Sequence, residues 1–380
     1  MTSTTTGLGG AAAGAHLDDD QIQALYGRRG PFLTLYLDTP GVEPESRQEF
    51  DLRWKSLRRV AEAEGAPDEL LAEIDVLMGG VDAYDDTLVV VATGDEILLD
   101  GPIGARRGMD QAFWHELPRL VPLIERRAEQ IPYVVVLADR EGADLAVVDR
   151  DDLATAVTVE GSRLHLSRSA PGGWSQRRYQ QRAENQWERN AAEVAAQVAE
   201  LADEVGAAFI AVAGDVRALQ FLGEHLADRH RDLLREIRGG RHEGDDLDGA
   251  AEDVARLQAT AAAEVTVAAL EDYAEQRAAS KAVQGADATF ASLQRGMVRR
   301  LFVVDDLADD RPSSHCWITD EPMLVATDGS SLRQLGHTPR RAPAVDAAVR
   351  AALAQGGEIV LAPRHGPNSP DGGIGAVLRG

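Results

Sequence analysis

The chain has 380 residues, 44% of them hydrophobic, and its 63 acidic residues against 39 lysines and arginines give a formal net charge of −24. This length predicts two or three domains, and the hydrophobic fraction is ample for their cores. Because the field of so acidic a protein repels phosphates, the composition argues against loose binding of nucleic acid or anionic membrane over the whole surface, and any nucleic-acid contact has to be local.

Cys316 is the only cysteine, which excludes an internal disulfide and a zinc site built on cysteines. We expect it to be an inert thiol in a core. Residues 1–16 are rich in threonine, glycine and alanine, without a basic start or a long apolar run. They are predicted to be a disordered start rather than a signal peptide or a membrane span. We therefore expect a soluble cytoplasmic protein with no cofactor and no metal.

Residues 17–130 are predicted to form an N-terminal α/β domain. Apolar alternation and helical periodicity predict a strand at 31–38, helices at 45–64 and 68–78, paired strands at 87–92 and 96–99, and a helix over 110–128. The first of these helices has one apolar side, formed by Phe50, Trp54, Leu57 and Val60 or Ala61. This domain contains no nucleophile, metal-ligand spacing or phosphate loop that predicts a function.

Residues 131–284 are predicted to form a central domain, a mixed sheet with helices packed on it. Strands at 133–139 and 143–149 flank Arg140-Glu141-Gly142, which is typical of a hairpin. The remaining predicted elements are a strand near 156–160, a helix over 177–205, a strand at 207–213, a helix from Asp215 to about 228, and a helix over 250–284.

Residues 285–380 are predicted to form a compact α/β/α sandwich. The pattern gives a helix at 286–294, strands at 297–304 and 323–326, a helix at 343–355, and strands at 358–362 and 375–378. Helices that alternate with strands through short connections are typical of this architecture.

The candidate site is the stretch Pro171-Gly-Gly-Trp-Ser-Gln-Arg-Arg-Tyr-Gln-Gln-Arg182. Gly172 and Gly173 allow the backbone to adopt positive φ and to approach another surface closely. The helix predicted after them carries Arg177 and Arg178, and six arginines stand against two glutamates from residue 163 to 189. Since arginine pairs well with phosphates, this basic island predicts an aimed contact. A plain loop before a solvated helix is the alternative.

Helical spacing separates two faces on this segment. One is an apolar stripe formed by Tyr179, Ala183, Trp187, Ala191, Val194, Val198, Leu201 and Val205. About a quarter turn away lie Arg178, Arg182, Asn185 and Arg189. We expect the apolar stripe to pack on the domain and the basic face to remain available to a partner.

A Gly-Gly segment that leads into an arginine-bearing helix, between an N-terminal α/β domain and a C-terminal sandwich, resembles the superfamily of archaeal and eukaryotic peptide chain release factors and Pelota. It is similar to the bacterial members of that superfamily and to the ribosome hibernation factor Balon. The resemblance covers residues 131–380 and implies a ribonuclease-H-like central domain and a ribosomal-protein-like last domain. The first domain matches only by position.

In the release factors that it resembles, the loop reads Gly-Gly-Gln and the glutamine positions a water at the peptidyl-tRNA ester. Here Gly172 and Gly173 match, Trp174 takes the place of the glutamine, and Gln176 stands two residues later. An indole has no carbonyl that orients water, but its face suits stacking on a base. A backbone N–H at position 174 remains suited to stabilising an oxyanion.

The resemblance implies a ribosome-binding hibernation factor that occupies the vacant A site, places loop 171–178 at the peptidyl transferase centre and suppresses translation under stress. The expected contacts to ribosomal RNA are Gly172, Gly173, Trp174, Ser175, Gln176, Arg177, Arg178, Arg182 and Arg189. We expect no catalytic residue, and an elongation factor GTPase is left open as a delivery partner.

Two enzymatic alternatives remain at this point. Ser175-Gln176-Arg177 is similar to the loop of some relatives that cleave peptidyl-tRNA, so a peptidyl-tRNA ester hydrolase that acts through Gln176 is the first. The second is a metal nuclease, because ribonuclease-H-like sheets carry carboxylate clusters and Asp139, Asp144 and Asp149 lie on the predicted hairpin.

Overall fold

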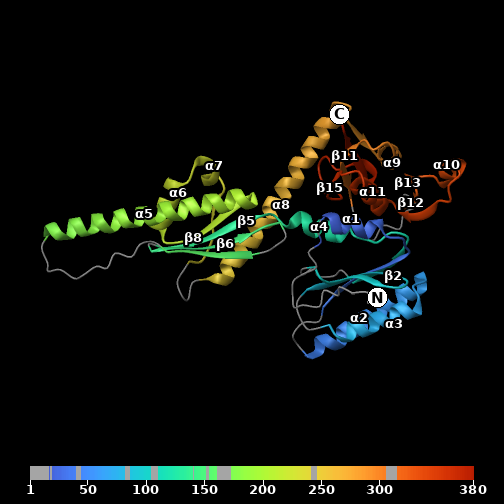
Figure 1. The fold of residues 1–380 in the computed structure, drawn as a ribbon, viewed down its shortest axis with the longest axis horizontal. Helices are drawn as coiled ribbons and strands as arrows, with labels where there is room; N and C mark the ends of the chain where they lie inside the picture. The colour runs from blue at the N-terminus through green and yellow to red at the C-terminus, as the bar shows by residue number, and fades with distance from the viewer. Residues whose placement is uncertain are drawn as a thin grey trace, which may run out of the picture. The chain divides into compact units, whose positions relative to one another are not determined.

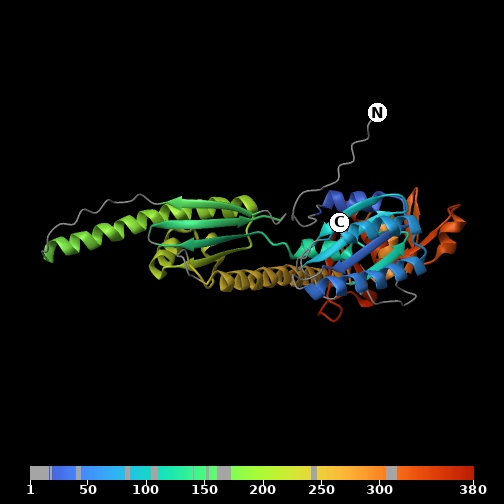
Figure 2. The ribbon, with the colours of Figure 1, turned by 90° about the horizontal axis from the view of Figure 1, so that it is seen from below.

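The computed structural model describes residues 17, 19–39, 44–81, 86–103, 110–139, 141–150, 154–160, 173–240, 246–304 and 315–380. Two compact units make up the chain: residues 1–127 join residues 266–380 in the first, and residues 128–265 form the second. Figures 1 and 2 show the helices and strands of both units in colours that follow the chain. The predicted α/β class is confirmed. Within the described ranges, no helix is long and apolar enough to span a bilayer.

The N-terminal sheet is antiparallel, with the strand order β3-β2-β1-β4. Its strands and helices are α1 (Asp19–Gly27), β1 (Phe32–Asp38), α2 (Pro44–Glu64), α3 (Asp68–Gly79), β2 (Thr87–Thr93), β3 (Ile97–Pro102), β4 (Gln111–His115) and α4 (Val121–Glu129). Leu33, Leu35 and Leu37 alternate along β1 and pack against α2 and α3, whereas Phe32 and Tyr36 belong to the core on the opposite face. Burial on both faces explains why β1 reads as an almost continuous apolar run.

The prediction of a helix over 110–128 is wrong in its first half, because residues 111–115 form β4 and pair with β1. Aromatic residues such as Phe113 and Trp114 favour a strand, and a neighbouring strand offers them a pleated surface. The helix begins only at Val121, where Pro122 is tolerated in the first turn. Helix α1 is absent from the sequence prediction.

The C-terminal part contains the predicted α/β/α sandwich. Its sheet has the order β10-β16-β11-β15, in which β11 and β15 are parallel. The elements are β10 (Ala282–Gln284), α9 (Ala286–Gln294), β11 (Val298–Val303), α11 (Ala344–Leu353), β15 (Glu358–Leu361) and β16 (Ile374–Leu378). Helices α9 and α11 cover one face of this sheet. On the other face, Phe302 and Val377 pack against Leu270 and Tyr273 of α8 (Leu247–Ala278).

A second, three-stranded sheet lies in the same segment. It has the order β13-β12-β14 and is formed by β12 (His315–Asp320), β13 (Met323–Ala326) and β14 (Arg340–Pro343), with the short helix α10 (Gly329–Gln334). Cys316 and Ile318 alternate toward the core. Cys316 is buried as predicted, and burial raises the pKa of its thiol well above the ordinary range. A thiol held neutral in this way is a poor nucleophile.

Helix α8 ends earlier than predicted, because the sequence has no glycine or proline there to mark its end. The helix stops at Ala278, and Ala282–Gln284 form β10 instead of helix. Ser280 adopts a left-handed conformation with φ 58°, the Lys281 N–H donates to the Gln276 carbonyl, and the Ser280 N–H donates to the Arg277 carbonyl. This is a Schellman cap in which serine takes the usual place of glycine.

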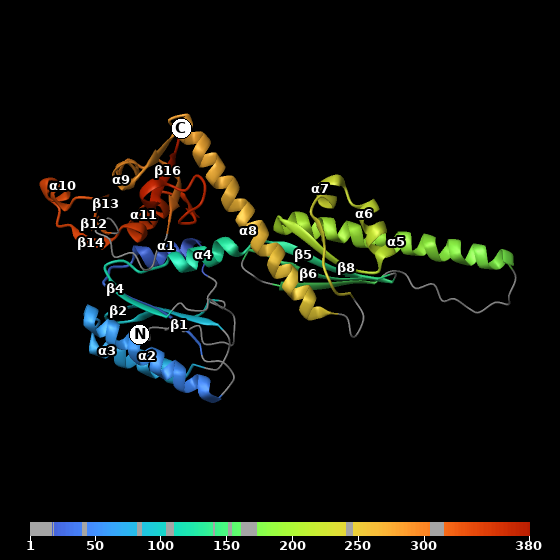
Figure 3. The ribbon, with the colours of Figure 1, turned by 180° about the vertical axis from the view of Figure 1, so that it is seen from behind.

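The central unit is the predicted mixed sheet with helices on both faces. Strands β7-β6-β5 are antiparallel, and β5-β8-β9 are parallel. The elements are β5 (Tyr133–Ala138), β6 (Gly142–Val148), β7 (Ala154–Glu160), α5 (Gly173–Val205), β8 (Phe209–Gly214), α6 (Val216–His225), α7 (Asp228–Arg231) and β9 (Leu234–Glu236). Helices α5 and α6 cover one face, and the first half of α8 covers the other (Figure 3).

Asp253 on α8 ties that helix to the end of β9 and gives the central unit a testable pH dependence. Its carboxylate accepts hydrogen bonds from the backbone N–H of Arg238 at 2.9 Å and from the guanidinium Nε at 3.0 Å. The Arg238 guanidinium and backbone N–H hold the pKa of the Asp253 carboxyl far below its usual range. Stability from this group is therefore complete above the unfolded pKa of about 3.9 and is lost as pH falls toward the folded pKa.

The Asp253→Asn variant is expected to be less stable than the wild-type protein at pH 7, because the charge that Arg238 and Arg256 face is gone. The difference should shrink as pH falls below about 4, where the Asp253 carboxyl of the unfolded wild-type chain begins to be protonated while the folded chain keeps it charged. Urea unfolding at constant ionic strength, followed by circular dichroism at several pH values, measures this difference. A stability difference between the two proteins that stays the same at every pH would contradict the pairing of Asp253 with Arg238.

Candidate functional site

Helix α5 carries the candidate site and is longer than the sequence predicts. It runs from Gly173 to Val205, 33 residues, which corresponds to about 50 Å of helix. It begins four residues before the predicted start, so positions 173–178 of the predicted loop 171–178 are helical, which corrects that prediction. No proline or β-branched residue interrupts the sequence after Gly173 up to Arg182. Pro171 and Gly172 lie outside the described residues.

The second half of α5 anchors the helix on the sheet. Ala191, Val194, Val198 and Leu201 are buried in the central core, which confirms the apolar stripe for this part of the helix. Asn190 is the first described side chain that is buried on α5, and its Nδ2 donates to the Glu141 carbonyl in the β5–β6 turn at 3.4 Å.

The first half of α5 continues past the end of the sheet, as Figures 1 and 3 show. Gly173 precedes Asn190 by 17 positions, or about 25 Å of helix. The predicted positions 173–178 and 182 therefore lie on a helical rod that extends away from its anchor. Arg189, next to the anchor, is exposed.

The rod combines two features that attract anions. Positions 178, 182 and 189 fall on one side of the helix, and all three are arginines. The first turn of any helix has backbone N–H groups without intrahelical partners and the positive end of the helix dipole. Helix N-termini of this kind bind phosphate groups, and arginine forks reinforce such binding.

The carboxylates of the nuclease alternative do not converge. Asp139 accepts hydrogen bonds from the backbone N–H groups of Glu141 at 2.7 Å and Gly142 at 2.9 Å, so it closes the hairpin turn. Asp144 accepts from the Thr158 hydroxyl at 3.0 Å. Asp149 follows β6 at the opposite end of the hairpin from Asp139. Among the residues that the structure covers, no three metal-ligating side chains come together, and this alternative loses its basis.

The sequence prediction does not give Asn190 and Asp139 the structural roles that they have beside the rod. The sequence gives Asn190 no role of its own within a long helix, and it offers Asp139 as a candidate metal ligand. A helical wheel places Asn190 next to Ala191 and Val194, so its burial was available as a signal. The hydrogen bond from Asn190 to the Glu141 carbonyl is not predictable from the sequence, because it depends on how the helix packs against the hairpin.

Comparison with known proteins finds one family match in the central part of the chain and two relatives along most of its length. Residues 132–279 match the family described as Bacterial archaeo-eukaryotic release factor family 2. Two Mycobacterium tuberculosis proteins, from different strains and both described as uncharacterized, are 23% identical over 374 residues, covering 95% of this chain and 96% of their own length.

Several solved structures are similar at low identity. The ribosome-bound archaeal Pelota is 16% identical, with 97% of this chain and 95% of that chain covered and a TM-score of 0.41. An archaeal translation termination factor is 15% identical, with 95% and 96% covered and a TM-score of 0.26. Pelota from Archaeoglobus fulgidus is 15% identical, with 77% and 79% covered and a TM-score of 0.35.

The family match includes the whole of the candidate stretch 171–182 and confirms the resemblance to the superfamily. The nearer likeness to the hibernation factor Balon stays a prediction. Residues 132–279 match the bacterial family 2 of archaeo-eukaryotic release factors, and this match supports the assignment of the chain as a bacterial member of the release factor and Pelota superfamily.

Proposed function

We propose that the protein is a ribosome-binding hibernation factor, which occupies the vacant A site, places segment 171–178 at the peptidyl transferase centre and suppresses translation. The observation that carries this proposal is the rod, because the N-terminal end of α5 lies about 25 Å along the helix from Asn190, the first of its described side chains that is buried. A narrow cavity lined with RNA admits such a rod and excludes a broad acidic surface.

Each part of the segment has a role in this proposal. Gly172 and Gly173 let the backbone approach the RNA closely. Trp174 stacks on a base, a contact that is worth about 1–3 kcal/mol. Arg177, Arg178, Arg182 and Arg189 pair with phosphates along the path of the helix. The net charge of −24 keeps the remaining surface away from RNA, so binding is confined to this helix.

The same segment favours occupancy over catalysis. Trp174 stands where a release factor has the glutamine that positions the attacking water, and an indole N–H donates but does not accept. The bound protein therefore fills the site without hydrolysing the peptidyl-tRNA ester. The ribosome is the proposed partner, and delivery by an elongation factor GTPase stays open.

Sedimentation with vacant ribosomes tests this proposal. The wild-type protein should pellet with them, and the Arg177→Ala/Arg178→Ala variant should remain mostly in the supernatant. The matched control is Lys55→Ala/Arg59→Ala, which removes the same charge from an exposed face of α2, where neither residue forms an ion pair within the described structure. A wild-type protein that stays in the supernatant, or a control that binds as weakly as the Arg177/Arg178 variant, would refute the proposal.

Peptidyl-tRNA hydrolysis remains the second candidate, and Gln176 is the residue that favours it. Gln176 lies in the first turn of α5, two positions after the tryptophan. Ribosomes loaded with peptidyl-tRNA should release no peptide when they are incubated with the protein. Release that disappears in the Gln176→Ala variant would establish the hydrolase instead.

A further inference from the structure

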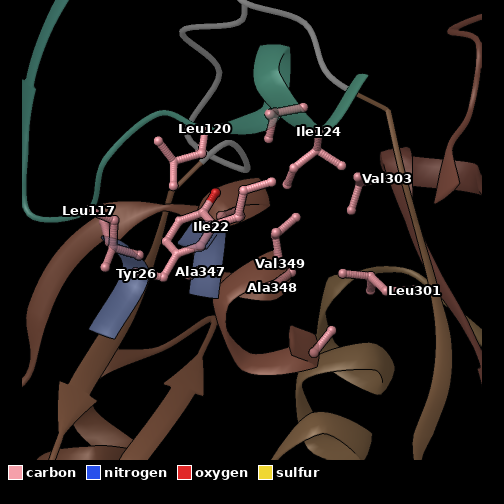
Figure 4. Packing of buried hydrophobic residues seen from close by; sticks show 14 of the residues in the cluster. Ile22, Tyr26, Leu117, Leu120, Ile124, Leu301, Val303, Ala347, Ala348 and Val349 are labelled. Atoms are coloured by element: carbon pink, nitrogen blue, oxygen red, sulfur yellow. The ribbon is translucent and has the colours of Figure 1, made fainter. Parts of the chain in front are cut away.

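The two segments of the first unit share a hydrophobic core, although residues 128–265 separate them in the sequence. Ile22 and Tyr26 of α1 meet Ala347 and Val349 of α11 in this core, as Figure 4 shows. Leu117, Leu120 and Ile124 approach from the segment around α4, and Leu301 and Val303 approach from β11. The N-terminal sheet and the C-terminal sandwich thus bury apolar surface against each other.

A buried ion pair crosses this shared core. The Asp346 side chain on α11 is fully buried, and it accepts a hydrogen bond from Arg119 Nη1 at 2.8 Å and from the Tyr26 hydroxyl at 3.2 Å. Arg119 is itself only 7% exposed. Burial, reinforced by the Asp346 charge, raises the pKa of Tyr26 well above its ordinary value, so the phenol remains a donor.

Arg119 is also bonded to the N-terminal sheet through its backbone. Its N–H donates to the Thr34 hydroxyl at 3.1 Å, and its carbonyl accepts from the Tyr36 hydroxyl at 2.7 Å. Thr34 and Tyr36 both belong to β1, one of the two inner strands of that sheet. A continuous path of hydrogen bonds therefore runs from β1 through Arg119 and Asp346 to α11.

A second polar path lies one helical turn further along α11. Arg350 Nη2 donates to Asp320 at 3.0 Å, and Asp320 also pairs with Arg340, which pairs in turn with Glu116. Glu116 belongs to the same connection as Arg119, between β4 and α4. Both paths thus join this connection to α11 and its neighbouring strands.

We propose that residues 17–127 and 266–380 open and unfold as a single body, with the Arg119–Asp346–Tyr26 cluster as the lock between them. Separation of the two halves would expose their shared apolar core to water and break the hydrogen bonds of this cluster, so neither half leaves the other without a large loss of stability. A partner that docks on the C-terminal sandwich consequently fixes the orientation of the N-terminal sheet as well. This coupling goes beyond ribosome binding and does not depend on it.

Hydrogen exchange of the full-length chain, read by mass spectrometry, tests the coupling. Asp346→Asn keeps the side-chain shape but removes the charge that Arg119 faces. Peptides from β1 and from β11 should both exchange about a hundredfold faster or more in this variant, while β5 and β8 of the central unit stay as in the wild-type protein.

Asp253→Asn is the matched control, because it breaks a carboxylate–arginine pair in the central unit. It should accelerate exchange in β8 and β9 and leave β1 and β11 unchanged. Tyr26→Phe is a milder second variant, because it removes one hydrogen-bond donor to Asp346. It should accelerate hydrogen exchange in both β1 and β11, by a smaller factor than Asp346→Asn. Faster exchange confined to α11 and β12, with β1 still protected in both Asp346→Asn and Tyr26→Phe, would overturn the proposal.

Discussion

Reversing the charge of two arginines on the rod, in an Arg177→Glu/Arg178→Glu variant, is expected to weaken ribosome binding by about a hundredfold. Hydrogen bonds to charged groups contribute about 1.5–3 kcal/mol each, and two lost phosphate contacts amount to at least this factor. The new carboxylates add repulsion from RNA. Equilibrium binding of a fluorescently labelled protein to vacant ribosomes measures the change.

The salt dependence of binding distinguishes the loss of phosphate contacts from a general loss of shape complementarity with the ribosome. For Arg177→Ala/Arg178→Ala, the slope of log K against log salt should become shallower by about two, one for each lost phosphate contact. Lys55→Glu/Arg59→Glu should leave affinity and slope unchanged. An unaltered slope in the Arg177/Arg178 variant would show that these arginines do not face phosphates.

The Gly214→Ala variant is expected to lose more than about 4 kcal/mol of folding stability. Gly214 ends β8 with φ 132°, and a Cβ there would lie 1.8 Å from the Ala138 carbonyl oxygen of β5. Backbone does not yield as a flexible side chain would, so β5 and β8 would have to separate at the centre of the sheet. Urea unfolding followed by circular dichroism measures the loss.

Gly206→Ala is the control for that prediction. Gly206 also has positive φ, 64°, but a Cβ there meets no atom within 4 Å. Only the left-handed strain of about 1–2 kcal/mol should appear in this variant. Equal losses in the two variants would mean that the close approach of Gly214 to Ala138 does not govern the stability of the sheet.

The sequence predicts those elements whose signal is local. Strand β1 and the β5–β6 hairpin follow from apolar runs, and α9 matches its predicted bounds of 286–294 because its periodicity is interrupted on both sides by glycine. Strands β4 and β14 are only four or five residues long, and a distant partner strand stabilises them. In segments this short, the strand propensity of residues such as Phe113 and Trp114 is too weak to distinguish them from a helix or a connection.

The candidate site also has features that are predictable from the sequence and features that are not. The Gly-Gly pair and the arginines of α5 are visible in the sequence because composition and spacing carry the signal. The helical state of positions 173–178 is less visible, since two adjacent glycines favour a turn over a helix. The Arg119–Asp346 pair, which is separated by 227 positions, is not predictable without the packing that brings α11 against the N-terminal sheet.

A single-particle map of the protein on vacant ribosomes tests the central claim most directly. We expect the first turns of α5 inside the peptidyl transferase centre, with Trp174 against a base of the ribosomal RNA and the arginines along α5 beside phosphates. A complex in which α5 faces solvent or protein, with Trp174 away from ribosomal RNA, would contradict the assignment.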